Sequence, residues 1–189
     1  MKKFVAAAFL ALTIVGVKAT PVLQSISPLA TNYTYGAGND FYSPVGSGDA
    51  DVTAQLWTTG PVSGLSGCNA SDFTGFVNGS IALIERGACT FATKASYAFA
   101  AGAIGVLIYN NVSGGVMTSP LPSDMYSGPI FYLSNNLGED FRNGASLGLT
   151  GYTVRMALTE EVTVIPEPGS LALVGLAIVA LVASRRRRT

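Results

Sequence analysis

Short apolar runs separate the polar stretches in the middle of the chain, at residues 81–85, 104–109 and 130–133. Each run has the length of a strand and carries few polar residues, which is typical of buried strands. A further run at 152–158 alternates only in part between apolar and polar positions. These four segments are predicted to be strands.

Residues 90–101 (TFATKASYAFAA) repeat their apolar side chains at helical spacing, with Thr90 suited to the N-cap and Gly102 to the stop. A strand, a helix and a strand within thirty residues predict a parallel crossover unit. Lys94 falls on the polar stripe of this helix and is expected to be a solvated ammonium. Residues 136–143 predict a second, short helix with acidic residues near its start.

Two segments lack this regularity. Residues 31–67 are rich in Gly, Ser, Thr and Tyr, and they predict turns and irregular strands. Residues 110–129 form a stretch of Asn, Ser, Gly and Pro, and a loop of about this length in a compact domain is usually functional or mobile. The whole pattern predicts an α+β fold.

The first 19 residues have the three parts of an export signal. Two lysines precede an apolar run, and Val17-Lys18-Ala19 offers the small-x-small pattern of a cleavage site. We therefore expect signal peptidase to cut after Ala19.

The C-terminal segment 169–189 combines an apolar stretch with four arginines, Arg185, Arg186, Arg187 and Arg188. Its uncharged part would form a helix of roughly 20 Å, shorter than the ~30 Å hydrocarbon core, and the arginines would hold its end in the cytoplasm. The prolines of Pro166-Glu167-Pro168 keep the preceding linker, 161–168, extended and accessible.

This layout resembles the PEP-CTERM sorting signal of Gram-negative bacteria. The resemblance implies recognition by an exosortase, a transient inner-membrane anchor, and release to the cell surface or exopolysaccharide matrix. The alternative is an ordinary C-terminal anchor.

The formal neutrality of the chain comes from its two ends. Residues 20–165 contain four basic and ten acidic residues, a net charge of −6. A domain with this charge and four scattered cations lacks the basic surface that nucleic acid requires.

Cys68 and Cys89 are the only cysteines, and an even count in an exported chain predicts a disulfide. The closed loop would contribute roughly 3 kcal/mol in the chain-entropy account. A reactive thiol is the alternative, but the chain has no histidine to serve as its base.

Three motifs follow one another along the chain: Gly67-Cys68, then GSIALIERGACTF at 79–91 with Lys94, then AAGAIGVLIYNN at 100–111. They resemble the protease-associated (PA) domain. The resemblance implies an open β-barrel or sandwich with flanking helices and one βαβ crossover, over residues 20–160 with its core at 67–158.

The same resemblance implies a non-catalytic module that binds peptides or proteins. Its ligand site would include Arg86, Gly87 and Ala88, together with Asn110 and Asn111. Arg86 can pair with a peptide carboxylate, while loop amides cap an extended chain. The alternatives are that Arg86 forms an ion pair ordering the loop, and that the two asparagines are turn formers.

No enzyme, catalytic residue, metal or cofactor is expected, because the absence of histidine excludes Ser-His and Cys-His triads and the usual zinc sets. Asp40, Asp49 and Asp51 lie among glycines and offer oxygen ligands to calcium, without a complete loop motif.

The predicted function is that of an exported protein that binds peptides or proteins at the cell surface. Two alternatives are a structural matrix protein and an accessory subunit of a separate secreted peptidase. The expected partners are signal peptidase and exosortase, an unidentified peptide or protein ligand, and possible exopolysaccharide contacts.

Overall fold

The computed structural model describes residues 18–58, 66–122, 126–146 and 152–161. Residues 19–159 form one compact unit, and residues 1–18 with 160–189 form another. The predicted signal peptide up to residue 17, the Pro-Glu-Pro motif and the apolar C-terminal segment lie outside the described residues. Among the described helices, none is long and apolar enough to cross a membrane.

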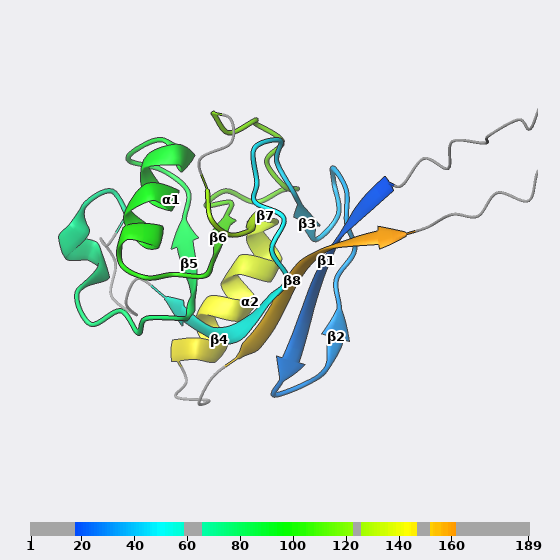
Figure 1. Cartoon of the computed structure of the whole chain (residues 1–189), viewed down its shortest axis with the longest axis horizontal. Coiled ribbons are helices and arrows are strands. Elements are labelled where there is room, and N and C mark those ends of the chain that lie inside the picture. Colours follow the sequence, from blue (N-terminus) through cyan, green and yellow to red (C-terminus); the bar gives the residue numbers. More distant parts are fainter. Residues whose placement is uncertain (1–17, 59–65, 123–125, 147–151, 162–189) are drawn as a thin grey trace, which may run out of the picture. The chain divides into compact units, whose positions relative to one another are not determined.

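The unit is built on one mixed sheet that forms a half-barrel with two helices (Figure 1). In sheet order the strands are β2 (Thr31–Asn32), β1 (Lys18–Ser27), β8 (Thr153–Glu161), β4 (Val52–Thr58), β5 (Ile81–Glu85), β6 (Gly105–Tyr109), β7 (Ile130–Leu133) and β3 (Phe41–Tyr42). Strands β4 to β7 run parallel, whereas the β1–β2, β4–β8 and β3–β7 pairs are antiparallel. The predicted α+β fold with a parallel crossover is confirmed.

Each central strand contributes alternate residues to the two faces of the sheet, as the two-residue strand period requires. One face packs against α2 (Asn135–Ser146) and includes Leu83 and Leu107. The other face packs against α1 (Phe91–Ala100) and includes Ile84 and Ile108. Because both faces are covered, β5, β6 and β7 read as continuous apolar runs with almost no alternation.

Helix α2 approaches the sheet very closely. A Cβ added to Gly138 would clash with the Cβ of Tyr109 on β6, so only glycine fits at this point of the helix. The pairing of Glu85 with Tyr109 and of Tyr109 with Leu133 brings the carboxyl ends of β5, β6 and β7 to one edge. The N-termini of α1 and α2, and the loop between β5 and α1, lie at this edge.

Several element boundaries differ from the sequence-based expectation. The helix predicted at 136–143 extends over Asn135–Ser146, and the strand predicted at 152–158 is Thr153–Glu161. The segment expected to hold only turns and irregular strands contains the regular strand β4, in which Leu56 is the one buried side chain. Strand β1 was not predicted, nor was the short 3-10 helix η1 (Ala70–Phe73).

Candidate functional site

The loop that joins β5 to α1 is held in one conformation by its backbone. The amide of Arg86 donates to the carbonyl of Tyr109 at 2.9 Å, which continues the β5–β6 ladder by one residue. The amide of Cys89 then donates to the carbonyl of Gly87 at 2.8 Å, closing a three-residue turn centred on Ala88. Ala88 has a φ of 65°, the one positive φ among the described non-glycine residues. A γ-turn with positive φ at its centre is the rarer and more strained form.

Covalent and capping contacts fix the rest of the loop. Cys89 is bonded to Cys68, so the predicted disulfide is confirmed, with the two Cα atoms 5.9 Å apart. Cys68 is itself held by its amide, which donates to a carboxylate oxygen of Asp72 at 2.9 Å. Thr90 caps α1 by accepting from the amide of Thr93 at 3.1 Å, as predicted.

Lys94 contradicts the expectation of a solvated ammonium. Its side chain is fully buried, and its Nζ donates to the carbonyl of Ser66 and lies 3.8 Å from the Sγ of Cys68. Burial lowers the pKa of Lys94, and the charges of Asp72 and Glu85 partly oppose this shift. The expectation was wrong because the disulfide-linked segment that contains Ser66 and Cys68 covers this side of α1. Lys94 therefore lies under a loop, while Ser96 and Tyr97 on the same helix stay exposed.

The guanidinium of Arg86 is held by a neutral partner. Its Nη1 donates to the Oδ1 of Asn110 at 3.0 Å. Asn110 is buried, its Nδ2 donates to the carbonyl of Gly115 at 3.0 Å, and its own carbonyl accepts from Asn135 at 2.9 Å. No ion pair of Arg86 occurs within the described ranges, in contrast to the alternative that an acid orders this loop.

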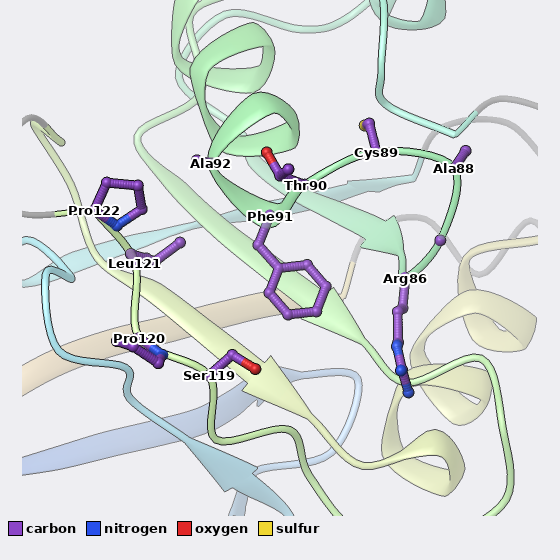
Figure 2. Close-up of a pocket in the computed structure, with 11 residues that line it drawn as sticks. Arg86, Ala88, Cys89, Thr90, Phe91, Ala92, Ser119, Pro120, Leu121 and Pro122 are labelled. Atoms are coloured by element: carbon purple, nitrogen blue, oxygen red, sulfur yellow. The ribbon is translucent and has the colours of Figure 1, made fainter.

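A pocket of about 600 Å³ opens beside this loop. Its lining residues are Arg86, Gly87, Ala88, Cys89, Thr90, Phe91, Ala92, Ser119, Pro120, Leu121 and Pro122. Figure 2 shows the ring of Phe91 between the loop that carries Arg86 and the segment 119–122. The surface is mostly apolar and Arg86 supplies its one charged side chain. A largely apolar cavity with a few polar groups is the usual form of a ligand site.

The five predicted ligand residues take different places in this arrangement. Arg86, Gly87 and Ala88 line the pocket. Asn110 and Asn111 do not line it. Asn110 accepts a hydrogen bond from the guanidinium of Arg86, and Asn111 is exposed, with its Nδ2 3.5 Å from where a Cβ at Gly87 would lie. Sequence reasoning missed the opposite wall, 119–122, although it marked the long loop 110–129 as a functional candidate.

Two of the three acids considered for calcium, Asp40 and Asp51, have partners of their own. A carboxylate oxygen of Asp40 accepts from the amide of Thr34 at 2.9 Å. Asp51 forms a bidentate pair with Arg155, at 2.7 and 3.0 Å, and this pair lowers the pKa of Asp51. In the described part of the chain, no three residues among His, Cys, Asp and Glu come together as a metal site.

Comparison with known proteins bears on the identity of this site. The PA domain family matches residues 52–141, which include every described residue that lines the pocket. This chain contains a PA domain. A second match, the PEP-CTERM protein-sorting motif, covers residues 164–188.

The relatives of the PA domain are peptidases. An aminopeptidase of Pseudomonas aeruginosa is 40% identical over 91 residues, which are 47% of this chain and 17% of the relative. Leucine aminopeptidase 2 of Trichophyton equinum is 42% identical over 86 residues, 46% of this chain and 17% of the relative. Among solved structures, a zinc aminopeptidase from Bacillus subtilis matches with a TM-score of 0.57 and 26% identity, over 76% of this chain and 31% of that one.

The prediction that the protein is not an enzyme is contradicted by these relatives, which point to a protease-related protein. The prediction relied on the absence of histidine from this chain. The residue types in a domain do not reveal the class of protein in which that domain occurs. The match is confined to the PA domain, and the chain spans about a sixth of the length of the curated relatives. Aminopeptidase activity is a property of those relatives.

Proposed function

We propose that this exosortase-sorted surface protein binds peptide or protein segments in the pocket between Arg86 and the segment 119–122. The observation that carries the proposal is the guanidinium of Arg86, which is held by neutral Asn110 at the rim of an apolar pocket. Arg86 retains donors for a carboxylate, because Asn110 engages only one of its nitrogens.

The loop beneath the pocket supports this proposal because its shape is set before any ligand arrives. The strand ladder, the turn at Ala88, the disulfide and the Thr90 cap each fix one part of it. A site with fixed groups loses little conformational entropy on binding, so more of the contact energy is expressed as affinity.

The relatives favour a second candidate, in which the ligand is a separate secreted peptidase and this protein is its accessory subunit. The supporting observation is that the same domain, with about 40% identity, forms part of aminopeptidases. Capture of a peptidase by the wild-type protein, abolished by Arg86→Gln, would favour this candidate over free peptides.

For processing, we propose cleavage after Ala19 and removal of the C-terminal segment near Pro166-Glu167-Pro168. The protein would then leave a transient inner-membrane anchor for the cell surface or the exopolysaccharide matrix. The PEP-CTERM match at 164–188 supports this route. Mass spectrometry of the extracellular fraction should find a mature protein whose chain ends near Pro166.

Affinity selection from a displayed random-peptide library tests the binding function. We expect peptides enriched on the wild-type protein to lose binding to Arg86→Gln and to keep binding to Arg142→Gln. Arg142 is a suitable control because it pairs with Glu139 on α2 and lines neither wall of the pocket. Failure to enrich any peptide, or equal binding to both variants, would refute the proposed site and favour a structural role in the matrix.

A further inference from the structure

A second pocket, of about 400 Å³, adjoins the pocket beside Arg86. It is lined by Ala92, Ser96, Phe99, Pro122, Tyr126 and Ser127. Ala92 and Pro122 line both pockets, so the two pockets are neighbours along α1. We refer to this combined surface as the α1 groove and to its second part as the aromatic pocket.

The two ends of the α1 groove differ in chemistry. At the start of the helix, Arg86 presents a positive charge that is unpaired with any carboxylate of the described residues. At the other end, the rings of Phe99 and Tyr126 lie with their centroids 6.0 Å apart, and both are half-buried. One end therefore suits a carboxylate and the other an apolar or aromatic side chain.

The helix gives a measure of the distance between the two pockets, because Thr90 lines the pocket beside Arg86 and Phe99 lines the aromatic pocket. From Thr90 to Phe99 it rises about 14 Å, at about 1.5 Å per residue. An extended peptide advances about 3.4 Å per residue, so this distance corresponds to about four residues. An extended peptide of about this length can therefore span the two pockets.

We propose that the α1 groove binds one extended peptide, with a carboxylate on Arg86 and an apolar, preferably aromatic, side chain in the aromatic pocket about four residues away. This inference rests on the proposed function and adds a ligand class and a spacing to it. The charge at Arg86 commits the groove to an acidic group at that end, within a domain that is otherwise acidic.

Four acetylated synthetic peptides test the spacing and the source of the carboxylate. The reference is Phe-Ala-Ala-Ala-Ala with a free C-terminus, compared with its C-terminal amide. A third peptide moves the phenylalanine to the middle position. A fourth, Phe-Ala-Ala-Ala-Asp amide, offers a side-chain carboxylate at the same spacing and in the same chain direction. Calorimetric titration of the protein recovered from the producing cells gives each Kd.

We expect the amide of the reference peptide, and the peptide with the wrong spacing, to bind about tenfold or more weakly than the reference. Tight binding of the reference alone assigns the site to a free C-terminus, and tight binding of the fourth peptide assigns it to a side-chain acid. Equal Kd values for all four peptides would overturn the inference.

Protein variants separate this inference from the proposed function. Ser96→Gln fills the aromatic pocket from an exposed position on α1, and Ala100→Gln makes the same change at an exposed position on α1 that lines neither pocket. We expect about tenfold weaker binding of the reference peptide to the first variant and an unchanged Kd for the second. Binding that depends on Arg86 but is insensitive to Ser96→Gln would overturn the two-ended groove and leave the Arg86 site intact. Binding that is insensitive to Arg86→Gln would overturn both.

Discussion

The turn at Ala88 allows a sharp test of the site geometry, because two adjacent substitutions should have opposite effects. Gly87 has a φ of 114°, and a Cβ added there would meet only an ordinary contact, with Asn111 at 3.5 Å. Gly87→Ala therefore carries a backbone penalty alone, about 1–2 kcal/mol. Ala88, at φ 65°, already carries a penalty of this kind.

Ala88→Gly removes that strain, about 1–2 kcal/mol, and adds about 0.5–1 kcal/mol of backbone entropy to the cost of folding. The net expectation is a gain of about 0.5–1 kcal/mol in the free energy of unfolding. Urea unfolding with the disulfide intact measures both variants, and an unchanged m-value would show that each variant exposes the same surface on unfolding. Ala100→Gly at the end of α1 is the control, with an expected loss of up to about 1 kcal/mol. If Ala88→Gly lowers the free energy of unfolding as much as this control does, Ala88 does not hold the strained turn.

Two further predictions concern buried polar groups. The hydroxyl of Tyr132 is buried without a hydrogen-bond partner in the described structure. Tyr132→Phe should therefore raise the free energy of unfolding, measured in urea, by about 1 kcal/mol. A decrease of similar size would show that the hydroxyl is paired. For Lys94, burial lowers the pKa, so between the folded pKa and the ordinary value of 10.5 the unfolded state binds more protons and stability rises with pH. The wild-type protein should therefore gain stability relative to Lys94→Met as the pH rises toward 10.5, and a stability difference independent of pH would refute the lowered pKa of Lys94.

The central strands could be predicted from sequence because burial on both faces leaves a continuous apolar run, as in Ile130–Leu133. Strand β4 could not, since most of its side chains are exposed or half-buried and its alternation is weak. The loop wall at Arg86 followed from motif resemblance. The opposite wall depends on contacts distant in sequence, such as the amide of Leu121 donating to the carbonyl of Val45 at 3.0 Å, and no local pattern reveals these.

Lys94 and Asn110 show how the fold supports the site from beneath. Each is a buried polar residue whose side chain holds a loop: Lys94 binds the carbonyl of Ser66 in the segment that carries Cys68, and Asn110 binds Arg86 and Gly115. Buried polar groups are costly unless they are paired, so these contacts specify one loop arrangement rather than add much net stability. The carboxyl ends of β5 and β6 are thereby fixed relative to α1, and in the proposed binding mode this geometry would hold the guanidinium of Arg86 in one place relative to the aromatic pocket.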